Sequence, residues 1–226
     1  MTDYTYEFKL ANQTPKEEIL NAFNSKSIRS LSRGIKQAYK WTSIWLKDPS
    51  NAVLVSYEFE KYIRGYVVSI AANYFVIKEI IDSDLGFDFF FRYNSNKSYP
   101  YLVITDKDKT FELTLNQTQK GNRCAPSSHF RDDLIDKYES SLFSSDNEVA
   151  NNDKRYFQLT HGYQTEEPGF INLGIPKKDG YWRDYIDISQ LLQVTESPIL
   201  KTKALEYKSL DLSKMQTYIN EVVKNE

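Results

Sequence analysis

The sequence predicts an α+β fold in which N-terminal helices pack on a mostly antiparallel sheet and a C-terminal helix follows. Three observations support this. Residues 14–82 carry apolar side chains at helical spacing, residues 86–188 contain six short runs of strand character, and residues 213–224 return to helical spacing. With 226 residues, 40 % of them apolar, the chain fits a single α+β domain over 1–226. Its helical part is expected at about 14–82 and its sheet-rich part at about 86–226.

Two helices are expected before residue 48. Thr14 and Pro15, followed by Glu17, form a favourable helix start, and Asn24 and Ser25 interrupt that helix. A second helix is expected over 27–47, because apolar side chains recur there at alternating steps of three and four. Gly34 lies inside it and costs roughly 1 kcal/mol of helix propensity.

A third helix is expected to be buried on most sides. Its predicted apolar stripe consists of Ile63, Val67, Ile70, Tyr74, Ile77 and Ile81, and Val68, Ala71, Ala72, Phe75 and Val76 widen that face. Residues 52–59 either open this helix or form a separate strand. A short helix is expected at about 130–140, and residues 144–154 are expected to be a mobile loop because they are polar and aperiodic.

Six strands are expected between about residues 86 and 188. The runs 87–93, 101–105 and 110–115 predict a three-stranded meander. The runs 156–160, 170–175 and 181–188 predict three more strands, separated by glycine and proline clusters. The stretch 155–188 holds half of the eight glycines in the chain, so we expect special backbone positions there.

Charge is distributed unevenly along the chain. The net charge is −2, but residues 19–47 contain six basic residues and no acidic ones. Five of the basic residues fall opposite the apolar stripe of the second helix: Arg29, Arg33, Lys36, Lys40 and Lys47. An exposed basic face of this kind predicts contacts with the phosphates of DNA or RNA. The alternative is the solvated face of an amphipathic helix.

Three residues are candidates for catalysis. His161 stands where a predicted strand meets a turn at Gly162, so it could act as a general base or contact a ligand. Arg131 and Asp184 are the charged residues that could assist it. The alternative is that His161 and the glycines of 162–180 form turns only. Similarly, the loop from Arg123 to Arg131 is either an anion-binding loop that feeds a helix or a simple helix cap.

Several common sites are missing from the sequence. There is no GxxxxGK[ST], GxGxxG or GxSxG motif, and two histidines with one cysteine cannot form a usual zinc site. No metal and no cofactor is therefore predicted, although a carboxylate site for Mg²⁺ would leave little trace. A nuclease of the restriction-enzyme type is disfavoured, because Thr114 stands two residues after Glu112 where that chemistry needs a lysine.

The expected location is cytoplasmic, without a membrane partner. The chain has one cysteine, Cys124, so it cannot form an internal disulfide. Its N-terminus lacks a signal-peptide pattern, and no apolar run approaches the roughly 20 residues of a membrane span.

Phe130-Arg131, residues 159–163 (LTHGY) and residues 173–176 (LGIP) together give a weak family signature. This pattern resembles an uncharacterised family of bacterial proteins associated with phages and other mobile elements. The resemblance implies no activity and no site residue.

The leading hypothesis is a non-enzymatic binding protein that contacts nucleic acid through the helix at 27–47 and serves a phage or mobile element. One alternative is an inhibitor or interaction module that binds a host protein. Another is a small hydrolase or nuclease that uses His161.

Overall fold

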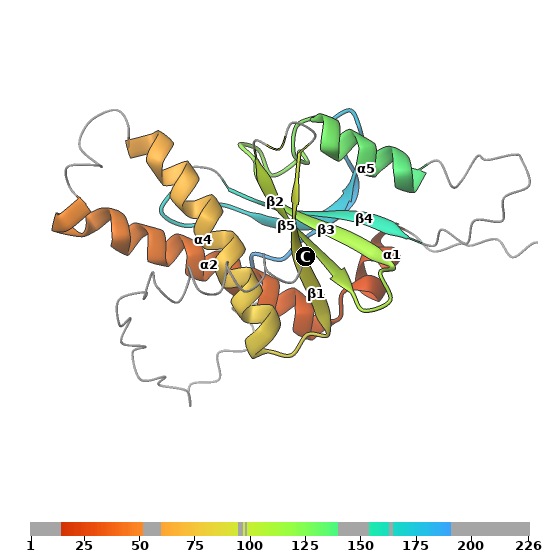
Figure 1. The fold of residues 1–226 in the computed structure, drawn as a ribbon, viewed down its shortest axis with the longest axis horizontal. Coiled ribbons are helices and arrows are strands. Elements are labelled where there is room, and N and C mark those ends of the chain that lie inside the picture. Colours follow the sequence, from red (N-terminus) through yellow and green to blue (C-terminus); the bar gives the residue numbers. More distant parts are fainter. Residues whose placement is uncertain are drawn as a thin grey trace, which may run out of the picture.

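The computed structural model describes residues 15–51, 60–94, 97, 99–139, 154–162 and 165–190. Within these residues, helices lie on both sides of one six-stranded sheet, which confirms the predicted α+β class (Figure 1). The predicted C-terminal helix at 213–224 and the undecided segment 52–59 lie outside the described residues, and so does nearly all of the predicted loop at 144–154.

The first two helices occur where the sequence predicts them. Helix α1 spans Pro15–Ala22 and helix α2 spans Ser25–Lys47. Helix α2 starts two residues earlier than predicted because Asn24 caps it: the Asn24 Oδ1 accepts a hydrogen bond from the Ser27 backbone N–H at 2.9 Å. A short 3₁₀ turn, Pro49–Asn51, follows.

Helix α4 (Glu60–Asp82) lies along α2 (Figure 1). The two backbones approach closely at Gly34, where an added Cβ would stand only 3.0 Å from the Cα of Val76. This close crossing requires the face of α4 with small residues, Ala71 and Ala72, to point inward. The predicted stripe of α4 is therefore wrong in part, since Ile70 and Ile81 are exposed.

The sheet contains all six predicted strands in sequence order. They are β1 (Phe87–Tyr93), β2 (Pro100–Asp106), β3 (Phe111–Gln117), β4 (Arg155–His161), β5 (Ile171–Pro176) and β6 (Trp182–Asp187). All neighbours are antiparallel except β3 and β4, which run parallel. A parallel pair needs a long crossover connection, and helix α5 (His129–Glu139) lies in it.

The two faces of the sheet have different partners. Helices α1, α2 and α4 pack against one face of the sheet and form one continuous core with it. This core includes Phe23, Leu31, Val76, Leu113 and Phe157. Helix α5 packs on the opposite face, where its side chains form a smaller cluster around Tyr156. Figure 1 shows α5 well separated from α2 and α4. The predicted helical and sheet-rich parts are therefore joined by one core.

Candidate functional site

The predicted basic face of α2 is partly neutralised in the fold. Arg29 is exposed, and Lys36 is half-buried. Arg33 instead reaches α4, where its Nε lies 2.9 Å from each carboxylate oxygen of Glu79. This hydrogen bonding raises the pKa of the Arg33 guanidinium, so its charge is matched within the protein.

The far end of α2 faces acidic residues. Lys47 forms an exposed ion pair with Glu166 at 3.0 Å. Lys36, Lys40 and Lys47 line a cavity of about 620 Å³ together with Glu166 and Glu167. The five predicted phosphate-binding residues therefore do not form a continuous unmatched basic stripe.

His161 is a buried core residue that contacts Tyr39 of α2. Its exposed fraction is 1 %, and its Nδ1 lies 2.9 Å from the Tyr39 hydroxyl. Because the Tyr39 hydroxyl donates its hydrogen to the Gly162 carbonyl, we assign Nδ1 as the protonated nitrogen, which donates to the hydroxyl oxygen. Burial lowers the pKa of His161 to about 4, so the ring is neutral near pH 7.

The structure does not bring the three catalytic candidates together. His161 lies on the helix-covered face of β4, in line with Phe157 and Leu159. Arg131 lies on α5 at the opposite face. The carboxylate of Asp184, on β6, accepts a hydrogen bond from the Tyr185 N–H. Among the described residues, no carboxylate hydrogen-bonds to His161.

Gly162 also has a structural explanation. A Cβ at this position would stand 2.9 Å from the backbone nitrogen of Gly169. Only a glycine at 162 therefore lets the backbone after β4 approach the backbone before β5 this closely. The predicted special backbone position at Gly162 therefore serves close packing next to His161.

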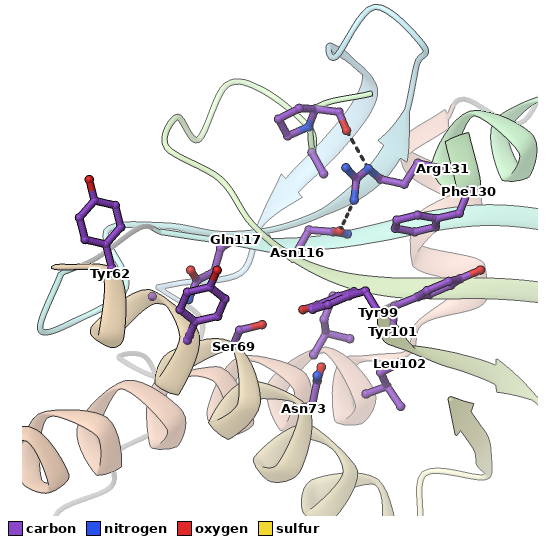
Figure 2. A pocket seen from close by; sticks show the side chains of 15 residues that line it. Tyr62, Ser69, Asn73, Tyr99, Tyr101, Leu102, Asn116, Gln117, Phe130 and Arg131 are labelled. Carbon is purple, nitrogen blue, oxygen red and sulfur yellow. Dashed lines mark hydrogen bonds between the residues drawn. The ribbon is translucent and has the colours of Figure 1, made fainter. Parts of the chain in front are cut away.

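A different cavity lies between α4, the start of β2, the end of β3 and the start of α5. Its volume is about 420 Å³. Figure 2 shows Ser69 of α4 on one side of it and Asn116 and Arg131 on the other. Among the described residues, no acidic residue lines this space, and Arg131 is the one charged residue that does. We call it the Arg131 cavity.

The Arg131 guanidinium is held rigidly in its place. Its Nε donates to the Pro126 carbonyl at 2.7 Å, and its Nη1 donates to the Asn116 Oδ1 at 3.3 Å (Figure 2). Within the described part of the chain no carboxylate lies within 4.0 Å of it. Burial lowers the pKa of this guanidinium from its usual value, because the charge has lost part of its hydration. An anionic group in the cavity would replace that lost hydration.

Aromatic rings form much of the remaining wall. They are Tyr62, Tyr66, Tyr99, Tyr101 and Phe130. Tyr62 and Tyr66 are 67 % and 70 % exposed, and they stand one helical turn apart on α4. Tyr101 and Phe130 stack with their ring centroids 4.2 Å apart. The cavity thus combines one fixed cation with several exposed ring faces.

Sequence reasoning identified Arg131 but not the rest of this wall. Tyr62, Tyr66, Ser69 and Asn73 recur at steps of four, three and four, which puts them on one face of α4. That spacing was a usable signal. However, the apolar residues of the same helix dominate its pattern, and no feature of the sequence shows that this face meets Arg131 some 60 residues later.

Comparison of the chain with protein families, with curated proteins and with solved structures found no match. None of the described helices is both long and apolar enough to cross a membrane. In the described ranges, His, Cys, Asp and Glu side chains form no group of three or more that could hold a metal ion.

Proposed function

We propose that this protein is a non-enzymatic nucleic-acid-binding protein that holds an unpaired nucleotide in the Arg131 cavity. One observation carries the proposal: a partly desolvated guanidinium, with no carboxylate near it among the described residues, opens onto a cavity with aromatic walls and no acidic lining. A phosphate and a ring system are the two chemical groups that such a wall recognises together.

The phosphate is expected to bind Arg131. A guanidinium has five N–H donors in a planar fork, and the described residues accept two of them. The others remain for phosphate oxygens, in charge-assisted hydrogen bonds that are stronger than neutral ones. Because Pro126 and Asn116 already fix the side chain, binding would cost little of its rotamer entropy.

The base is expected to stack on the tyrosines. Stacking of a base on an aromatic side chain contributes about 1–3 kcal/mol and tolerates any base, because every base has a π-face. The amide side chains of Asn73 and Gln117 also line the cavity and can hydrogen-bond to base edges. The cavity volume of about 420 Å³ falls within the range of small-ligand sites and suits one unstacked nucleotide rather than a base pair.

The test is binding of a fluorescently labelled single-stranded oligonucleotide, followed by anisotropy at low salt. We expect Arg131→Gln and Tyr66→Ala each to weaken binding at least about tenfold, which corresponds to about 1.4 kcal/mol. Arg183→Gln and Tyr93→Ala are matched controls outside the cavity and should bind as the parent does. Tyr66 is highly exposed, so its replacement tests the cavity even if the Arg131 variant folds poorly.

Absence of binding at low salt, or cavity variants that bind like the controls, would refute the proposal. In that case the exposed face of α4, with Tyr62, Tyr66 and Ile70, would favour the host-protein partner instead.

The basic face of α2 remains a second proposed contact surface for DNA or RNA. Arg29 and Lys36 have no carboxylate within 4.0 Å in the described part of the structure, whereas Arg33 and Lys47 are engaged by Glu79 and Glu166. Service to a phage or mobile element stays a prediction from the family resemblance.

A further inference from the structure

A second hollow adjoins the Arg131 cavity. It lies where β3 ends and the following loop turns back, and its volume is about 390 Å³. Gln117 and Pro126 line both spaces, so the two hollows meet at these residues. Lys120 and Arg123 line the second hollow only, and we call it the Lys120–Arg123 hollow.

The second hollow is positive as well. Among the described residues, Lys120 and Arg123 are its charged lining residues, and no acidic residue lines it. Arg123 lies over the ring of Tyr181 at 3.5 Å, which orients its guanidinium. In the described ranges neither cation has a carboxylate within 4.0 Å. Together with Arg131, three cations and, within the described residues, no acidic residue therefore line two adjoining spaces of a chain whose net charge is −2.

The junction between the hollows holds an unpaired donor. The Nε2 of Gln117 is buried and has no hydrogen-bond partner in the part of the chain that the structure describes. A buried donor without an acceptor costs free energy, so an acceptor from a ligand would stabilise this arrangement. Phosphate and base carbonyl oxygens are such acceptors. The cavity of about 620 Å³ beside α2 is not uniformly positive in this way, because Glu166 and Glu167 line it together with the lysines of α2.

We infer that the two hollows form one track for single-stranded nucleic acid of at least two nucleotides. One nucleotide occupies the Arg131 cavity, the chain passes Gln117 and Pro126, and the next phosphate lies between Lys120 and Arg123. This inference rests on the proposed function and adds its ligand class: an oligonucleotide strand rather than a mononucleotide. A duplex is excluded because its bases are already paired and stacked and cannot enter the first cavity.

The experiment compares the affinities of a nucleoside 5′-monophosphate and a tetranucleotide of the same base, measured by calorimetry at low salt. The parent is expected to bind the tetranucleotide at least about tenfold more tightly. The double variant Lys120→Gln/Arg123→Gln is expected to lose that gain while it binds the mononucleotide as before. Its slope of log affinity against log salt should become shallower by about 0.7, because one phosphate contact is lost and each phosphate in a single strand contributes roughly 0.7.

Lys107→Gln/Arg183→Gln, which removes two exposed cations elsewhere, is the matched control. Equal affinity for the two ligands would overturn the track while leaving the cavity proposal intact. If the Lys120→Gln/Arg123→Gln variant still bound the tetranucleotide about tenfold more tightly than the mononucleotide, the track would also be overturned. The strand would then leave the Arg131 cavity by another route. Failure of both ligands to bind would overturn the proposed function and the track together.

Discussion

Replacing His161 by glutamine is expected to remove a pH dependence of about 2 kcal/mol from the free energy of unfolding. In the folded protein the ring is 1 % exposed and hydrogen-bonded to Tyr39, and burial lowers its pKa to about 4. In the unfolded chain a histidine has its ordinary pKa of about 6.5.

The sign follows from where the proton binds. Between about pH 6.5 and pH 4 the unfolded chain takes up a proton at His161 and the folded protein does not, so acid favours unfolding. The contribution of the neutral, buried His161 ring to the free energy of unfolding is complete above about pH 6.5 and is lost as the pH falls towards 4. With these two pKa values, the loss between about pH 7.5 and pH 5 is about 2 kcal/mol.

Urea unfolding at those two pH values measures the effect in the parent, in His161→Gln and in His129→Gln. The chain has only these two histidines, and His129 is exposed, so His129→Gln is a matched control. The carboxylates contribute nearly equally to the pH dependence of unfolding in all three proteins. The difference in pH dependence between the variants therefore gives the contribution of His161. If the His161→Gln protein lost as much stability between pH 7.5 and pH 5 as the His129→Gln control, the conclusion that His161 is buried and neutral would be refuted.

Three further predictions concern α2. Arg33→Gln leaves the nearly buried Glu79 carboxylate without its cation and is expected to cost about 1–2 kcal/mol in denaturant unfolding, against less than about 0.5 kcal/mol for the exposed control Arg29→Gln. Gly34→Ala places a Cβ against the Val76 backbone and is expected to destabilise by about 1–3 kcal/mol despite its better helix propensity, so a gain in melting temperature would contradict the close crossing. Duplex DNA binding through α2 is expected to show a salt slope of about −2, because Arg29 and Lys36 have no carboxylate within 4.0 Å among the described residues, and Arg29→Gln should flatten it by about 0.9.

The elements of this fold were largely predictable because their signals are local. Alternation of apolar side chains at a period of two, as in Phe87–Tyr93, and short apolar runs between turn residues located every strand to within two residues. The steps of three and four likewise located α2, and only its start shifted, because the capping role of Asn24 depends on one hydrogen bond.

Pairing and burial were less predictable because they depend on distant residues. The parallel neighbours β3 and β4 are joined by a connection of 37 residues (118–154), and periodicity says nothing about which strands pair. The apolar stripe of α4 was assigned to the wrong residues in part, since its orientation is set by the close approach to Gly34, about 40 positions earlier.

The candidate site was predictable only in fragments. The sequence marked Arg131 and the loop from Arg123 as a possible anion site, and also grouped Arg131 with His161, which the sheet separates from it. Tyr62 and Tyr66 by themselves carry no signal in the sequence because exposed tyrosines on a helix are common, and only the fold shows that they line the same cavity as Arg131.

Photocrosslinking tests the central claim most directly, because it reports where the nucleotide lies. A short single-stranded oligonucleotide with 5-iodouracil reacts with aromatic side chains in contact with the base, and mass spectrometry identifies the peptide. We predict crosslinks to Tyr62, Tyr66 or Tyr99 in the wall of the Arg131 cavity. Crosslinks confined to the stacked pair Trp41 and Trp45 on α2, or no crosslink at all, would contradict the account.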